Sequence, residues 1–118
     1  MALNRDQIIE KSDLVTETVS VPEWGGEVIV STMTGEARDE WEQSLVVTNG
    51  GKAETNMANI RARLVIYSVV DENGNRLFNS GDIAALGRKS GAALERVCKV
   101  AQRLNALTAD EVEQLKGN

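Results

Sequence analysis

The sequence has 118 residues, of which 42% are hydrophobic, enough for one hydrophobic core and too few for two comfortable domains. Its 13 Lys and Arg stand against 18 Asp and Glu, and the resulting net charge of -5 disfavours nucleic acids and anionic membranes as partners. Histidine is absent and Cys98 is the only cysteine, so metal hydrolysis, histidine-dependent catalysis and an internal disulfide are excluded. We therefore expect one domain, residues 1–118, that is not an enzyme and has no cofactor, metal or catalytic residues.

The beginning of the chain predicts a cytosolic protein. No apolar run reaches the roughly 20 residues that span a bilayer, and residues 1–11 lack the basic-then-apolar order of a secretion signal. Asn4 and Gln7 form a capping-box pattern, which predicts a short helix over residues 5–11.

Alternating valines then predict a β-hairpin. Residues 15–21 alternate Val with Thr and Ser, and Val28 and Val30 repeat the period of two. Residues 22–26 contain Pro22 and a Gly pair, which supply the conformations of a chain reversal with Trp24 at its apex.

A helix capped by Thr34 follows, with Ala37, Trp41 and Leu45 spaced four residues apart on its inner stripe. Residues 48–55 contain two adjacent glycines and almost no apolar side chain. This composition predicts a mobile loop rather than a domain linker.

The most apolar stretch, residues 57–69, predicts the central helix. Its last part, residues 64–70, is rich in β-branched residues and also fits a strand, and we prefer the helix. Residues 71–75 are typical of a tight turn or small hairpin because Asn-Gly suits positive φ angles.

Three capping patterns mark the remaining helices. Ser80 is expected to cap a short helix that ends at Gly87, and Ser90 is expected to cap a longer one with an apolar inner face. Thr108 and Glu111 form a capping box for a last helix. The fold class is therefore predicted as α+β, an N-terminal β-hairpin packed on a mainly helical C-terminal part with about five or six helices.

Reactive groups are scarce. Adjacent acidic residues fall at expected turns and helix starts, where solvated carboxylates are the rule. Cys98 follows Val97 on the apolar stripe of a predicted helix, so we expect it to be buried and structural rather than nucleophilic.

Seven residues are candidates for binding another protein. Trp24 at the hairpin tip is either a recognition anchor or folded back onto the core, with the second favoured. The apolar pair beside the glycine loop could present apolar surface, and several cations could form a basic face. The candidates are Trp24, Val46, Val47, Arg61, Arg63, Arg88 and Lys89.

A series of short motifs resembles the tail assembly chaperones of long-tailed phages. The motifs follow one another over nearly the whole chain, and their order is more specific than any one of them. They are VPEWGGEV at 21–28, RARLV at 61–65, VDENG at 70–74 with LF at 77–78, IAALGRKS at 83–90, AQRLN at 101–105 and LT at 107–108. The chain departs from the family pattern at Gly81 and in the loop at residues 48–55.

The resemblance implies a function. Such chaperones bind the tape measure protein in the host cytoplasm, help the tail tube protein polymerise around it and leave before the virion is finished. A standard interface of roughly 800 Å² per partner is small beside so long a client, which indicates several copies per client and a possible homo-oligomer. Many relatives are late proteins made in two forms by a programmed frameshift, and residues 115–117 are compatible with a slippery heptamer.

Two other functions remain open. The short helix, the Gly87 break and the longer helix resemble a helix-turn-helix, which would make the chain a DNA-binding regulator. A head-tail connector or other structural part of the virion would also be a small phage protein. The first requires salt-dependent DNA binding, and the second requires the protein to persist in finished particles.

Overall fold

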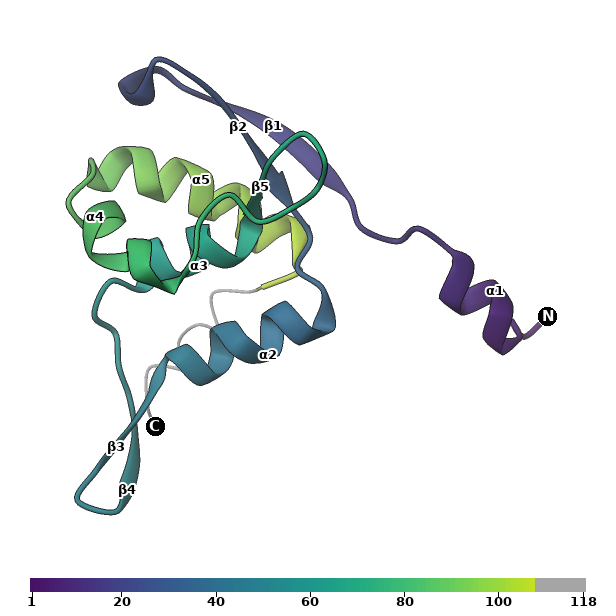
Figure 1. Ribbon diagram of the computed structural model, residues 1–118, viewed down its shortest axis with the longest axis horizontal. Helices are drawn as coiled ribbons and strands as arrows, with labels where there is room; N and C mark the ends of the chain where they lie inside the picture. The colour runs from purple at the N-terminus through teal and green to yellow at the C-terminus, as the bar shows by residue number, and fades with distance from the viewer. Residues whose placement is uncertain (108–118) are drawn as a thin grey trace.

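The computed structural model describes residues 1–107, and they form an α+β fold (Figure 1). Within these residues are five α-helices, two short 3-10 turns, a three-stranded sheet and a separate two-stranded hairpin. The predicted fold class is confirmed. The last helix expected after Thr108 lies outside the described residues.

The first helix, α1, spans Arg5–Glu10 and is capped as the sequence predicted. The Asn4 side chain accepts a hydrogen bond from the Gln7 amide at 2.9 Å, and the Gln7 side chain accepts one from the Asn4 amide at 2.9 Å. None of its residues is buried. The helix stands clear of the other elements, joined to them by an extended segment (Figure 1).

Strands β1 (Thr16–Val21) and β2 (Gly26–Ser31) pair antiparallel, which confirms the predicted hairpin. Val19 lies opposite Val28, so both point to the same face of the sheet. The short strand β5 (Val69–Val70) pairs with β2 on its other side, giving the order β1-β2-β5.

Helix α2 spans Gly35–Ser44 and begins where Thr34 accepts a hydrogen bond from the Ala37 amide at 3.0 Å. Trp41 and Leu45 are buried, as the predicted stripe requires. The prediction of a mobile loop at residues 48–55 is wrong. Instead, β3 (Val46–Asn49) and β4 (Lys52–Thr55) form an antiparallel hairpin. The glycine pair at 50–51 has φ angles of 61° and 84°, so it supplies the tight two-residue turn that joins the strands.

Helix α3 spans Ile60–Ser68 and is the most buried helix, as predicted. Neither the helix nor the strand alternative for residues 64–70 is right alone, because the helix ends at Ser68 and β5 follows at once. Val69 lies opposite Val30 of β2. The β-branched pair therefore leaves the helix to complete the sheet.

The turn predicted at residues 71–75 is confirmed. The Asp71 side chain accepts hydrogen bonds from the amides of Asn73 and Asn75 at 2.8 and 3.0 Å. Gly74 takes a φ of 84°, in the left-handed region that suits glycine.

A 3-10 turn, η2 (Ser80–Asp82), leads into α4 (Ile83–Gly87). The predicted cap at Ser80 is wrong: Asn79 forms the capping box, with Asp82 as its reciprocal partner. Gly87 is also not a left-handed residue beyond the helix. It lies within α4, where an added Cβ would come within 2.6 Å of the Asn59 side-chain oxygen.

Helix α5 (Gly91–Leu104) is capped by Ser90, as predicted, and packs against β1, β2 and α3. The helices α2, α3 and α5 and one face of the three-stranded sheet enclose the core. Its largest fully buried apolar side chains are Val21, Val30, Trp41, Leu45, Val65, Ile66, Val69 and Val97.

Candidate protein-interaction surfaces

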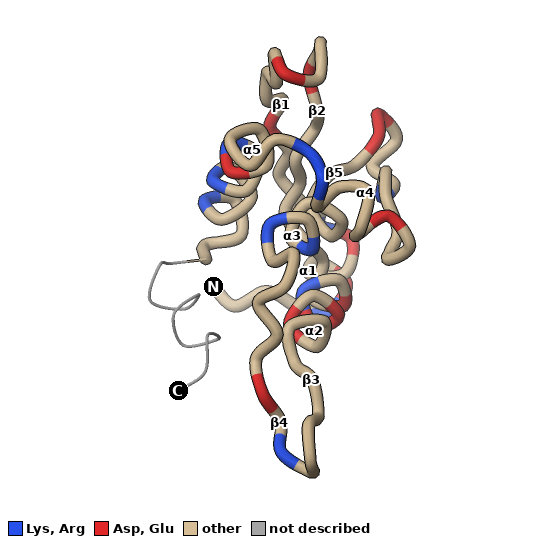
Figure 2. Tube along the Cα trace, turned by 90° about the vertical axis from the view of Figure 1, so that its left-hand side faces the viewer, with Lys and Arg blue, Asp and Glu red and all other residues tan. Residues whose placement is uncertain are grey.

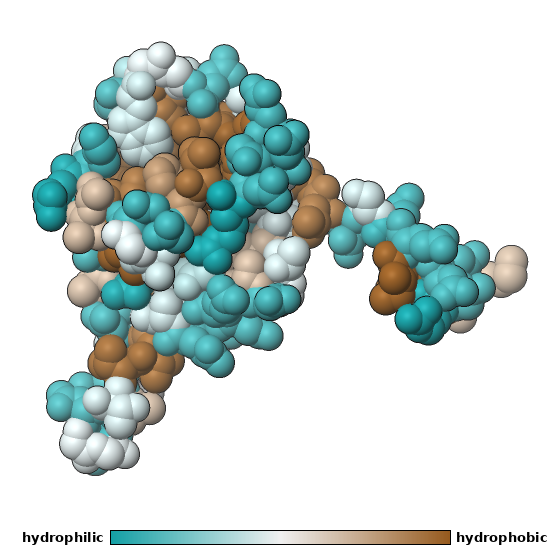
Figure 3. Space-filling view, viewed as in Figure 1, coloured by the Kyte–Doolittle hydropathy of each residue, from teal (hydrophilic) through white to brown (hydrophobic). Residues whose placement is uncertain are grey.

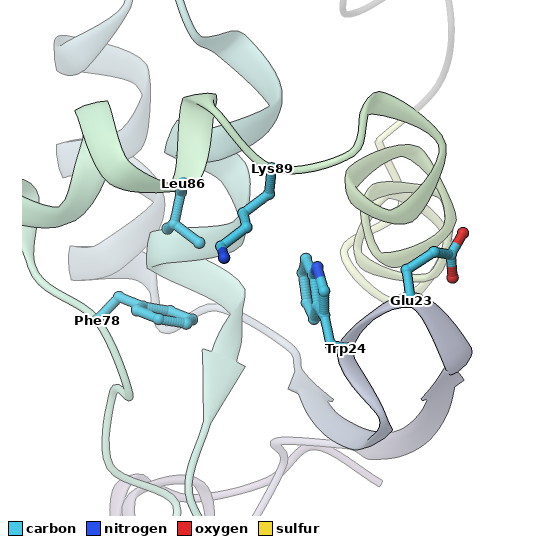
Figure 4. A pocket seen from close by; sticks show the side chains of 5 residues that line it. All are labelled: Glu23, Trp24, Phe78, Leu86 and Lys89. Carbon is cyan, nitrogen blue, oxygen red and sulfur yellow. The ribbon is translucent and has the colours of Figure 1, made fainter.

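A pocket of about 390 Å³ lies between the tip of the β1–β2 hairpin and the end of α4. The chain reverses in η1 (Pro22–Trp24), and Gly25 follows with a φ of 76°. Figure 4 shows the rings of Trp24 and Phe78 on opposite sides of the pocket, with Leu86 above them and the Lys89 amine reaching over the gap. We call these four residues, with Glu23 at the rim, the aromatic pocket.

An ion pair fixes the hairpin tip on α5. Arg96 binds Glu23 through two hydrogen bonds, Nη1 to Oε1 at 2.5 Å and Nη2 to Oε2 at 3.0 Å. The hydrogen bond from Arg96 lowers the pKa of Glu23, and the same bond raises the pKa of Arg96. The Glu23 carboxylate turns away from the pocket to reach Arg96 (Figure 4), and no other acidic residue within residues 1–107 lines the pocket beside Lys89.

Arg88 and Lys89 are exposed cations next to this pocket. Within residues 1–107 neither has an ion pair, whereas Arg61, Arg76 and Arg103 pair with glutamates. Figure 2 shows the stretch between α4 and α5 as a continuous basic segment. In a chain with excess acid, unpaired adjacent cations beside an apolar cavity favour an acidic and apolar partner.

A second surface lies on the β3–β4 hairpin. Val46 and Val47 are 49% and 40% exposed, and they begin the strand that projects from the end of α2. A hollow of about 370 Å³ beside Val46 is lined by Asp39, Glu42 and Gln43. Figure 3 shows apolar atoms gathered where this hairpin leaves the body.

The two arginines of α3 are already engaged within the chain. Arg61 Nε donates to Glu95 Oε2 at 2.5 Å, and this bond raises the pKa of Arg61. Arg63 Nε donates to the carbonyl oxygen of Ala58 at 2.9 Å. The seven residues named from the sequence thus fall into three places: the aromatic pocket and its cations, the β3–β4 hairpin, and α3.

Sequence reasoning missed two features. Phe78 and Leu86 complete the aromatic pocket, and only the return of the chain to the core after the 71–75 turn pointed to the first of them. The other is the segment before β1, which carries six of the nine large apolar side chains that are exposed within residues 1–107. Sequence reasoning had no periodic signal for this segment, because a helix of six residues is too short to show a repeating apolar stripe.

Cys98 is buried, as predicted, and its thiol donates to the Arg61 carbonyl oxygen at 3.4 Å. Burial raises the pKa of the thiol to about 12, so it stays protonated near neutral pH. In the described part of the chain, no three Cys, Asp or Glu side chains are placed to hold a metal ion. None of the helices described here is long and apolar enough to cross a membrane.

The fold and these surfaces define a small α+β protein that exposes apolar side chains of the kind found at interaction sites. Residues 4–116 match the model of the phage tail assembly chaperone family. The chain belongs to that family. Comparison with curated protein sequences gave no match.

A solved structure described as the tail assembly chaperone of bacteriophage HK97 has a similar fold. The TM-score is 0.56 at 24% sequence identity, and the alignment covers 77% of this chain and 85% of the other. At this identity the likeness concerns the fold alone. It agrees with the family match, which rests on the sequence.

Proposed function

We propose that this protein binds the tape measure protein of a long-tailed phage in the host cytoplasm, keeps it soluble, and assists the tail tube protein in polymerising around it. The family match over residues 4–116 carries the proposal. Acting as a chaperone requires a binding surface and solubility but no turnover chemistry. The protein is accordingly proposed to be non-enzymatic and absent from the finished virion.

We place the client contact on the β3–β4 hairpin. Successive residues of a strand point to opposite faces, so Val46 and Val47 give the projecting hairpin one exposed apolar side chain on each face. The amphipathic helices of a client could lie against either face, and the acidic hollow beside Val46 favours a client helix that carries Lys or Arg. Arg61 and Arg63, whose guanidinium groups bond within the chain, are not needed for this contact.

Co-expression with the tape measure protein tests the proposal. The wild-type chain is expected to make the client soluble and to co-purify with it, and a client that stays insoluble and unbound would refute the chaperone function. Val46→Ser and Val47→Ser, made separately, show which face of the hairpin is used. Leu77→Ser removes a similarly exposed apolar side chain elsewhere and should leave client binding unchanged.

Finished virions provide a second test. Mass spectrometry of purified particles should detect the tape measure protein and not this chain. Persistence of the chain in the particles would instead favour a structural role in the virion.

A further inference from the structure

The segment before β1 is an apolar arm that does not pack against the rest of the protein within residues 1–107. We define the arm as residues 3–14. Leu3, Ile8, Ile9 and Leu14 are 68%, 57%, 68% and 47% exposed, and no residue of α1 is buried. Figure 3 shows a group of apolar atoms at the surface of this arm, which projects from the body. Leaving several large aliphatic side chains in water is unfavourable, which is typical of a segment that docks on a partner.

The body holds the chain at the root of the arm. The Thr32 amide donates to the Val15 carbonyl oxygen at 2.9 Å, and the Val15 amide donates to Thr32 Oγ1 at 3.2 Å. Beyond Val15 towards the N-terminus, no hydrogen bond or ion pair within residues 1–107 joins the arm to the rest of the protein. Among the described residues, the arm is therefore fixed at one end and exposed along the rest of its length.

The arm and the aromatic pocket have complementary chemistry. In the arm, Ile8 and Ile9 precede Glu10, whose carboxylate has no ion pair within the described residues. In the pocket, apolar walls made by Trp24 and Phe78 lie beside the unpaired amine of Lys89. Each surface carries what the other lacks: aliphatic side chains with an acid on one, and an apolar cavity with a cation on the other.

We propose that the arm of one copy docks on the aromatic pocket of a second copy, with Ile8 and Ile9 against the rings of Trp24 and Phe78 and Glu10 paired with Lys89. This self-association is separate from the client contact on the β3–β4 hairpin. Self-association of this kind would place several copies along one client, in keeping with the proposed function.

Reach favours a second copy over the arm's own pocket. The root at Val15 and the pocket at Trp24 lie at opposite ends of β1, whose six residues span about 20 Å. The linker at residues 11–14 covers at most about 14 Å, so α1 reaches its own pocket only if the whole arm doubles straight back along the strand. Figure 1 shows the arm leading in the opposite direction.

The contact joins two different surfaces, so it is heterologous. Each copy in such a contact has both an arm to give and a pocket to fill, and a third copy can add to either end. Burying two isoleucines and one ion pair is less than a standard interface offers, so we expect a dissociation constant of roughly micromolar or weaker.

Sedimentation velocity over a range of protein concentrations measures the association. The wild-type chain should grow in mass as concentration rises. Ile8→Ser with Ile9→Ser should weaken association at least tenfold, because each buried isoleucine contributes more than a tenfold factor. Lys89→Glu should weaken it as well. Lys52→Glu makes the same charge change on the distant β3–β4 hairpin and should have no effect.

Two further experiments separate docking from a loss of folding. Glu10→Lys combined with Lys89→Glu restores the ion pair with reversed charges and should recover most of the association. In a mixture, the Ile8→Ser/Ile9→Ser chain keeps its pocket and the Lys89→Glu chain keeps its arm. At a concentration where each variant alone is monomeric, that mixture should form a 1:1 dimer and nothing larger.

The results that overturn the proposal are specific. A wild-type chain that stays monomeric at all concentrations, or variants that associate like the wild type, would rule it out. A mixture of the two variants that remains monomeric would do the same, as docking within one copy predicts. Capture of the tape measure protein by a monomeric chain would leave the proposed function standing while this inference fails.

Discussion

Replacing Asn105 tests whether one buried side chain holds the segment between β2 and α2 against the end of α5. Asn105 is 6% exposed and ends α5. Its Oδ1 accepts a hydrogen bond from the Met33 amide at 2.6 Å, and its Nδ2 donates to the Ala101 carbonyl oxygen at 2.8 Å. The residue thereby ties the segment between β2 and α2 to the end of α5.

The cost of Asn105→Ala follows from what it leaves behind. Ala101 still accepts the backbone amide of residue 105 at 3.0 Å, but the Met33 amide loses its acceptor, and Met33 is only 7% exposed. An unsatisfied buried donor costs about 1–3 kcal/mol, and the lost packing adds to it. We expect the free energy of unfolding to fall by about 2–3 kcal/mol, which moves the urea midpoint down by roughly 1–2 M for a chain of this size.

Asn105→Asp provides a sharper comparison. It keeps an acceptor for Met33 but turns a carboxylate oxygen towards the Ala101 carbonyl, which raises the pKa of the new carboxyl in the folded state. Stability is then retained at acid pH, where the group is protonated, and is lost as pH rises through that raised pKa. Asn49→Ala, at an exposed asparagine, is the control. If Asn105→Ala shifts the midpoint no more than this control, the two hydrogen bonds do not support the fold as argued.

Three other predictions concern a thiol, an ion pair and two glycines. Because burial raises the pKa of Cys98 from 9.0 to about 12, unfolding releases a proton in this range, and stability should fall by up to about 1.4 kcal/mol per pH unit between the two values. In denaturation experiments across this pH range, the Cys98→Ala variant should lack the part of the stability loss that comes from the thiol. Because Arg96 holds the pKa of Glu23 below 4.5, the pair stabilises the protein above that pH and loses its effect as pH falls through the lowered pKa. Glu23→Gln should therefore show a weaker dependence of melting temperature on acid, and an unchanged dependence contradicts the pairing. Gly74→Ala should cost about 1 kcal/mol because its φ is 84°, whereas Gly91→Ala, at the start of α5 with open space around it, should stabilise by about 0.4–1 kcal/mol. Equal effects of the two alanines on the urea midpoint would count against the backbone argument.

The candidate surfaces were only partly predictable. Trp24 and Lys89 were named separately, one as the apex of a hairpin and the other as part of a basic face. The structure brings them into one pocket with Phe78 and Leu86, residues that come from a loop and a short helix far along the chain from Trp24. Which side chains meet across such distances depends on how α4 and α5 pack on the hairpin tip, and no local pattern encodes that.

The sequence by itself determined the features whose causes lie within a few residues. The caps at Asn4, Thr34 and Ser90 are predicted correctly because each side chain bonds to an amide three residues away. The valine alternation predicted the β1–β2 hairpin for a similar reason, because successive side chains of a strand point to opposite faces of the sheet.

Tertiary structure decided the features whose partners are distant. The end of α3 at Ser68 depends on β2, because Val69 becomes a strand residue by pairing with Val30, far earlier in the chain. The hairpin at residues 46–55 is not such a feature, because its strands are neighbours in the sequence and the glycine pair between them is typical of a tight hairpin turn. Helix caps and strand alternation depend on residues that are close together in the sequence, whereas burial and sheet pairing depend on segments that are far apart in it. For that reason the helix starts and the first hairpin could be predicted from sequence, while the pocket and the exposed arm required the fold.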